Sequence, residues 1–182
     1  MGRFFTADTH FDHENIIRLC GRPFKNVYEM DEFMIGEWNG VVSNDDIIHH
    51  LGDLAWRNIK RAERILTRLN GRKFLCCGSH DGRILELARY FEEIKNSFLI
   101  EINGGQFIFM SHRIQEPWPG SCFGSWHLFG HSHGKLNTYA EQHGKLLDVG
   151  VDSHKFRPWS LTEVAQVMAT RPPNFNEIKR AK

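Results

Sequence analysis

The chain has 182 residues, of which 41% are hydrophobic, so it is long enough to form one well-buried domain. Its 23 lysines and arginines nearly balance its 22 acidic residues, and the formal net charge of +1 excludes a strong long-range attraction to nucleic acid or an anionic membrane. No apolar run approaches the roughly 20 residues of a membrane span, and no signal-peptide pattern is present, so we expect a cytoplasmic protein.

The first half of the chain alternates predicted strands and helices. Apolar runs indicate strands over residues 2–7, 46–51 and 73–77, while helical spacing of apolar residues indicates helices over 27–42, 59–69 and 82–90. A shorter helical turn is expected over residues 15–19. This alternation is typical of parallel α/β units with right-handed crossovers.

The second half has the pattern of an antiparallel or mixed sheet. Strands are expected over residues 98–102 and 107–112, joined by the hairpin signal Asn103-Gly104-Gly105-Gln106. Further strands are expected over 126–129, 145–149 and around 161–164. We expect one domain over residues 1–170, followed by a loosely ordered tail over 171–182 that contains Pro172-Pro173.

The four cysteines do not have the spacing of a disulfide framework or a thiolate zinc site. They form no Cys-x-x-Cys pair, and two are adjacent: Cys20, Cys76, Cys77 and Cys122. We expect all four to be reduced, with the ordinary role of small buried side chains.

Potential metal ligands follow several of the predicted strands. In chain order these motifs are Asp8-x-His10, Gly52-Asp53, Gly78-Ser79-His80-Asp81, His112 and Gly130-His131-Ser132-His133. A single Asp-x-His match is common by chance, but five such signals in order are not. Carboxylates and imidazoles suit divalent transition metals, and the carboxyl ends of strands in an open α/β sheet line a shared crevice. The sequence therefore predicts a metal site.

In this order, the motifs resemble those of the calcineurin-like metallophosphoesterase superfamily over residues 8–133. Two further stretches resemble its compact bacterial and phage members, namely Asp12-His13-Glu14-Asn15-Ile16 and Asp148-Val149-Gly150-Val151-Asp152. The resemblance implies a four-layer α-β-β-α sandwich, in which two mixed sheets flanked by helices carry a dinuclear metal site at their upper edge.

The resemblance also implies a role for each motif residue. Two divalent ions (Mn, Fe, Zn or Ni) would be held, one by Asp8, His10 and His133, the other by Ser79, His112 and His131, with Asp53 bridging them. A hydroxide shared by the ions would attack the phosphorus, so no protein nucleophile is required. His80 would protonate the leaving oxygen, and Asp81 would orient His80.

The chain departs from the family pattern at Ser79, where asparagine is usual. A serine hydroxyl is shorter and a poorer ligand, so the second ion would be held about 10- to 100-fold less tightly. We expect a metal-dependent phosphoesterase, either a phosphodiesterase or a phosphomonoesterase, that acts on a small substrate such as a nucleotide. The alternative is a metal-binding scaffold of the same fold that is catalytically weak or silent. The balanced charge argues against extended nucleic acid as a partner.

Several other side chains are candidates for substrate contacts. His13, Arg22 and Arg113 could line the substrate pocket or bind phosphate, although ordinary solvated charge is the competing interpretation for the two arginines. Aromatic residues near the ligand motifs could stack on a nucleobase or simply pack in the core: Trp118, Phe123, Trp126 and Trp159. Strand alternation predicts that His49 and His50 face opposite sides of their sheet, one inward and one outward, in structural roles.

Overall fold

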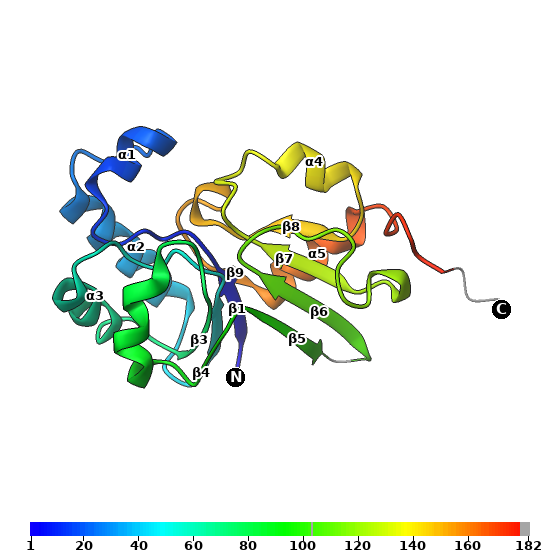
Figure 1. The fold of residues 1–182 in the computed structure, drawn as a ribbon, viewed down its shortest axis with the longest axis horizontal. Coiled ribbons are helices and arrows are strands. Elements are labelled where there is room, and N and C mark those ends of the chain that lie inside the picture. Colours follow the sequence, from blue (N-terminus) through cyan, green and yellow to red (C-terminus); the bar gives the residue numbers. More distant parts are fainter. Residues whose placement is uncertain (103, 179–182) are drawn as a thin grey trace.

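The computed structural model, which describes residues 1–102 and 104–178, is a mixed α/β fold with two mixed sheets flanked by helices (Figure 1). The first sheet has the order β4-β3-β2-β1-β9. Strands β1 to β4 are parallel, and β9 runs antiparallel to β1. Their bounds are β1 (Arg3–Thr6), β2 (Ile47–His50), β3 (Arg72–Cys76), β4 (Glu93–Lys95) and β9 (Trp159–Ser160).

The second sheet has the order β5-β6-β7-β8 and contains β5 (Ser97–Ile102), β6 (Gln106–Ser111), β7 (Trp126–Phe129) and β8 (Leu146–Asp148). Strand β5 is antiparallel to β6, whereas β6, β7 and β8 are parallel. The predicted hairpin therefore joins β5 and β6, although Asn103 in its turn lies outside the described residues.

Helices cover the outer face of each sheet. On the first sheet lie α2 (Val27–Val41), α3 (Ile59–Leu66) and the 3-10 segment η1 (Asp81–Tyr90), while α1 (Glu14–Cys20) lies near the upper edge (Figure 1). The second sheet carries α4 (Asn137–Gln142). The remaining elements are α5 (Leu161–Thr170) and two short 3-10 turns, η2 (Ser121–Phe123) and η3 (Val151–Ser153).

Three apolar clusters hold these layers together. Side chains of α2 and α3, such as Trp38 and Ile65, pack on Ile48 of the first sheet. Phe5 and Leu128 belong to a second cluster, between the two sheets, which α5 joins through its own side chains. The third cluster lies between the second sheet and α4. In the part of the chain that the structure describes, no helix is both long enough and apolar enough to cross a membrane.

The prediction of a strand around residues 161–164 is wrong, because α5 begins at Leu161. Ser160 accepts a hydrogen bond from the Glu163 backbone N–H, and the Glu163 carboxylate accepts one from the Ser160 N–H. This capping box satisfies two of the free N–H groups at the helix start. The segment expected as an α-helix over 82–90 is a 3-10 run, and it starts one residue earlier.

The tail expected to be loose is held in place as far as the structure describes it. The Asn174 side chain is buried, donates to the carbonyl oxygens of Ser121 and Ser125, and accepts from the backbone N–H of Lys145. The part of the tail around Asn174 is therefore bonded to residues of the domain, while 179–182 lie outside the described residues. Within that range all four cysteines are free thiols.

Candidate metal centre

The loops after β1, β2 and β3 meet at one edge of the first sheet because these strands are parallel and adjacent. Two backbone hydrogen bonds continue the pairing beyond the strands: Asp8 N–H donates to the Gly52 carbonyl, and His10 N–H donates to the Asp53 carbonyl, both at 3.0 Å. The loop that carries Asp8 and His10 is thereby fixed against the loop that carries Asp53.

Most of the expected ligands have a left-handed backbone conformation. Their φ angles are 56° at Asp8, 50° at His10, 56° at Asp53, 67° at His131 and 48° at His133. Each such angle at a non-glycine residue costs free energy, on the order of 1–3 kcal/mol, and persists only where the surrounding structure enforces it. Repetition of this geometry at five expected ligands points to a functional constraint.

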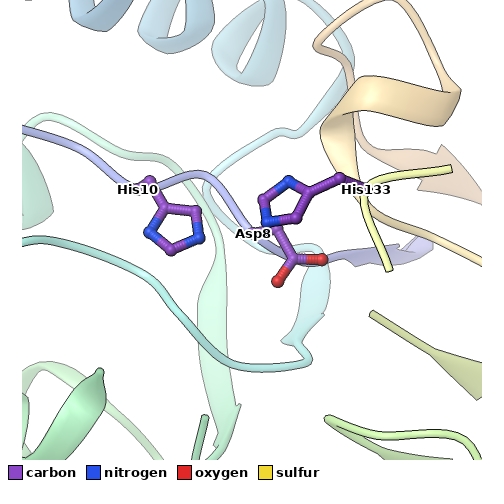
Figure 2. A group of neighbouring side chains, drawn as sticks. All are labelled: Asp8, His10 and His133. Atoms are coloured by element: carbon purple, nitrogen blue, oxygen red, sulfur yellow. The ribbon is translucent and has the colours of Figure 1, made fainter. Parts of the chain in front are cut away.

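Asp8, His10 and His133 form the first donor group (Figure 2). One ligand atom from each residue lies within 4.8 Å of the other two. The rings of His10 and His133 are stacked with their centroids 5.2 Å apart, and Asp8 is fully buried. Figure 2 shows the three side chains converging from two separate loops.

Asp53, His112 and His131 form the second donor group, again with one ligand atom each within 4.8 Å of the others. Oδ2 of Asp53 lies 3.4 Å from Nε2 of His112 and 3.6 Å from Nε2 of His10. The Asp53 carboxylate therefore lies between the two groups, as expected for a residue that bridges two cations.

Several buried polar atoms at this site have no hydrogen-bond partner among the described residues. They are Oδ1 of Asp8 and both ring nitrogens of His10. Burial raises the pKa of Asp8 well above its ordinary value, and the carboxylates of Asp148 and Asp53 raise it further. A divalent cation would use these free atoms as ligands and relieve the repulsion between the carboxylates, so the residues present fit a metal ion.

Two of the expected ligands favour the protonation state that would bind a metal ion. Burial lowers the pKa of His10 to about 2, so its imidazole is neutral at ordinary pH. Burial by itself would raise the pKa of Asp53, but hydrogen bonding and charge from His112 outweigh it and hold that pKa below its ordinary value. Asp53 is therefore ionised.

Ser79 and His80 lie beside the second donor group. The Ser79 hydroxyl oxygen is 3.3 Å from Oδ2 of Asp53 and 3.4 Å from Nε2 of His112. The His80 backbone N–H donates to Asp53 at 2.8 Å, and its imidazole, which is 41% exposed, places Nε2 3.9 Å from Oδ2 of Asp53. The His80 ring can therefore reach both solvent and a molecule bound between the two groups.

Asp81 does not orient His80, so this expectation is wrong. Its carboxylate accepts hydrogen bonds from the backbone N–H groups of Asp53, Leu54 and Gly78, at 2.8 to 2.9 Å. These bonds occupy both carboxylate oxygens, and within the described residues none joins Asp81 to the His80 imidazole. Asp81 instead ties the loop after β2 to the loop after β3.

Arg22 is buried and its guanidinium is already paired, so its expected role in binding substrate is also wrong. The residue is only 4% exposed, and its guanidinium donates to both oxygens of Asp152 and to the carbonyls of Asp8 and Thr9. These contacts occupy the group that would have to bind phosphate. Arg22 therefore holds in place the loop that carries Asp8 and His10.

Asp152 and Asp148 also support the site, and sequence reasoning assigned neither a role. Asp152 accepts from Nδ1 of His133 at 2.8 Å, and Asp148 bonds to the Ser132 hydroxyl and to Gly134 N–H. In the sequence, Asp148 and Asp152 were marked only by the stretch 148–152. That stretch by itself does not indicate which expected ligand each carboxylate contacts.

The expected substrate contact His13 lines a cavity of about 560 Å³ that opens over the donor groups. The cavity is also lined by Asn15, Ile16, Leu19, Trp56, His80 and Lys135, together with the expected ligands His10, Asp53, His131 and His133. Arg113, another expected contact, is exposed and does not line this cavity. Burial and, secondarily, the positive charge of Arg113 lower the pKa of His131.

No protein-family model matches the chain. The uncharacterized protein MJ1445 of Methanocaldococcus jannaschii is 33% identical over 170 residues, which cover 91% of this chain and 90% of that protein. The Gene 66 protein of Mycobacterium phage L5 is 32% identical over 82 residues, 43% of this chain and 39% of that protein.

A solved structure is similar over most of the chain. It is the protein of unknown function AQ665 from Aquifex aeolicus, with a TM-score of 0.74 and 28% identity, covering 91% of this chain and 98% of that one. The extent and identity of the match to the archaeal protein show that this chain belongs to the same family as MJ1445.

Proposed function

We propose that the chain is a divalent-metal-dependent phosphohydrolase of the calcineurin-like metallophosphoesterase type. The observation that carries the proposal is the pair of donor groups with Asp53 between them. Two adjacent groups of carboxylate and imidazole ligands suit a pair of divalent transition metals such as Mn, Fe, Zn or Ni. Sites of this kind are used for phosphoryl transfer.

The proposed fold is the four-layer α-β-β-α sandwich of that superfamily. Its support is the position of the three apolar clusters between successive layers. The first cluster lies between the helices and the first sheet, the second between the two sheets, and the third between the second sheet and α4. The donor groups lie on loops that follow strands of both sheets, because Asp53 follows β2 and His131 follows β7. Ligands that far apart in sequence meet only if the two sheets pack against each other.

The chemistry follows from how the side chains are placed. Two bound divalent cations would polarise the phosphoryl oxygens and lower the pKa of a water molecule towards neutrality. Asp8, His10 and His133 would hold one cation, and His112, His131 and Ser79 the other, with Asp53 reaching both. His80 lies in the cavity beside Asp53 and would donate a proton to the leaving oxygen.

A second candidate function is a metal-binding scaffold with little or no turnover. The observation in its favour is Ser79, whose neutral hydroxyl takes the place of an amide ligand in the second group. The exposed imidazole of His80 favours the phosphohydrolase instead, because a scaffold without turnover does not need a proton donor in the cavity. Turnover distinguishes the two functions, because both would bind metal.

The test is to titrate the protein with Mn²⁺ by calorimetry and to assay it on bis(p-nitrophenyl) phosphate. Asp53→Asn should weaken binding of both ions, whereas His80→Ala should keep metal binding and lower kcat by about 10²- to 10⁴-fold. An assay with Zn²⁺, Fe²⁺ and Ni²⁺ extends the comparison. Metal binding without turnover of any phosphoester would favour the scaffold, and absence of metal binding would reject both functions.

A further inference from the structure

The cavity over the donor groups has an apolar wall that metal binding does not require. Ile16 and Leu19 of α1 and the indole of Trp56 line it together with the ligands. Leu19 is 60% exposed, and α1 begins four residues after His10. An exposed leucine in the same cavity as metal ligands would contact whatever is attached to a bound phosphate.

Trp56 is held in a fixed position on this wall. Its ring stacks on His13 with centroids 3.9 Å apart and an interplanar angle of 6°, and its backbone N–H donates to the Phe11 carbonyl at 2.7 Å. The His80 ring lies 5.0 Å from the indole. The Trp56 ring is therefore fixed beside His80, the residue that would face an ester oxygen. His13 covers one face of the ring, and the guanidinium of Arg57 lies 5.0 Å from the ring centroid.

Two polar side chains of the cavity indicate which class of molecule would bind beside the apolar wall. Asn15 lines the cavity beside Ile16, and its amide offers both a donor and an acceptor. Lys135, two residues after His133, brings a cation to the same cavity. A flat apolar ring with a hydrogen-bonding edge, joined to a phosphate, matches this combination better than an alkyl chain, which would leave the amide unused.

Other aromatic residues do not offer such a wall. Trp118 is buried in the third apolar cluster, and Trp126 and Trp159 pack against the cluster between the sheets. Phe123 is exposed but does not line this cavity. Among the aromatic side chains considered for stacking from the sequence, none lines the cavity that holds the ligands, whereas Trp56 does.

We infer that the wall formed by Ile16, Leu19 and Trp56 is a subsite for the nucleoside part of a nucleotide ester. This inference rests on the proposed function, because it assumes that phosphate binds at the donor groups. It assigns nucleotide esters as the substrate class and gives α1 the role of selecting them.

The test is calorimetric titration of the Mn²⁺-loaded protein with inorganic phosphate, ribose 5-phosphate and thymidine 5'-monophosphate. The nucleotide should bind on the order of tenfold more tightly than the other two, as expected for stacking of one base. Leu19→Ser and Trp56→Ala should reduce this preference without changing the affinity for inorganic phosphate. Leu99→Ser, which replaces a 52% exposed leucine on β5, is the matched control.

Equal affinities for the three ligands in the wild-type protein would overturn the subsite, as would an equal loss of phosphate and nucleotide binding in Leu19→Ser. Leu19 is exposed, so its replacement tests the subsite even if Trp56→Ala fails to fold. If the nucleotide preference is found but no phosphoester is hydrolysed, the subsite stands and the proposed activity fails. If inorganic phosphate does not bind in this titration, both the subsite and the proposed function are rejected.

Discussion

Nδ1 of His133 lies 2.8 Å from Oδ2 of Asp152, and the same carboxylate receives the bidentate guanidinium of Arg22. A carboxylate only accepts, so Nδ1 of His133 carries the proton and Nε2 keeps a free lone pair for a cation. Burial raises the pKa of Asp152, but hydrogen bonds from His133 and Arg22 overcome this effect and lower it to about 2. The carboxylate is therefore ionised, and it orients His133.

Replacing Asp152 with asparagine should weaken metal binding at the first donor group by about 10- to 100-fold. The amide can accept only through its oxygen, so it cannot hold both Arg22 and His133 as the carboxylate does. Calorimetry with Mn²⁺ should show the loss mainly in the binding step assigned to Asp8, His10 and His133.

The matched control for Asp152→Asn is Asp45→Asn, which changes an exposed aspartate outside the site and should leave both binding steps intact. Unchanged affinity in Asp152→Asn would show that His133 keeps its orientation without the carboxylate. A loss shared equally between both binding steps would contradict the assignment of His133 to one group.

Adding a methyl group at Gly78 should disrupt the site. A Cβ at this position would lie 2.3 Å from the backbone nitrogen of Asp53 and 2.4 Å from its Oδ1, so the two loops would have to separate. We expect Gly78→Ala to lower the free energy of unfolding by about 1–3 kcal/mol, as overpacking does, and to abolish metal binding. Urea unfolding and Mn²⁺ titration measure the two effects.

Gly82→Ala is the control for this substitution, because a Cβ there would meet no described atom within 4 Å. It should preserve stability and metal binding. If Gly78→Ala behaves like Gly82→Ala, the close approach of the loops after β2 and β3 does not constrain the site.

Much of the site could be predicted because its ligands follow strands directly. Asp8, Asp53 and Ser79 each come shortly after one of the parallel strands of the first sheet, so apolar runs and short motifs were enough to group them. The supporting contacts could not be predicted in this way. Arg22 and Asp152 are 130 residues apart, and nothing in either local sequence indicates the other.

The fold was harder to predict where local patterns are ambiguous. Residues 161–164 have the composition of a strand, and only Ser160 and Glu163 at capping-box spacing indicate the helix that forms. His49 and His50 do point to opposite faces, but both are buried, because one face of the first sheet packs on helices and the other on the second sheet. Strand alternation does not reveal whether a sheet is covered on both sides.

Replacing Ser79 with asparagine should strengthen the second donor group. The longer amide would bring a carbonyl oxygen towards the space between Asp53 and His112, where the serine hydroxyl now makes contacts of 3.3 to 3.4 Å. We expect the affinity for the second Mn²⁺ to rise by about 10- to 100-fold, with a parallel increase in phosphodiester turnover. Ser79→Ala should lower both. Equal metal content and turnover in the wild type and Ser79→Asn would show that Ser79 does not limit the site.

The buried imidazole of His49 should make the fold sensitive to acid. Its ring stacks on Phe5 and Phe74, and burial, with the positive charge of Arg3, lowers its pKa to about 3. In the unfolded chain a histidine has a pKa near 6.5, so the unfolded state binds the proton more readily. The contribution of His49 to stability is therefore complete above pH 6.5 and is lost by about 1.4 kcal/mol per pH unit from there towards pH 3. His50, whose pKa burial also lowers to about 3, adds a similar slope of its own.

Urea unfolding at several pH values between 7 and 4 measures this loss, and His49→Leu should make the profile less steep by about 1.4 kcal/mol per pH unit, because it removes one of the titrating groups. The absolute stability of the variant at pH 7 does not matter, since the test compares slopes. His143→Asn replaces an exposed histidine and should keep the wild-type slope. If His49→Leu shows the same slope as the wild-type protein, the acid sensitivity arises from another buried group, such as His127, whose pKa burial lowers to about 4.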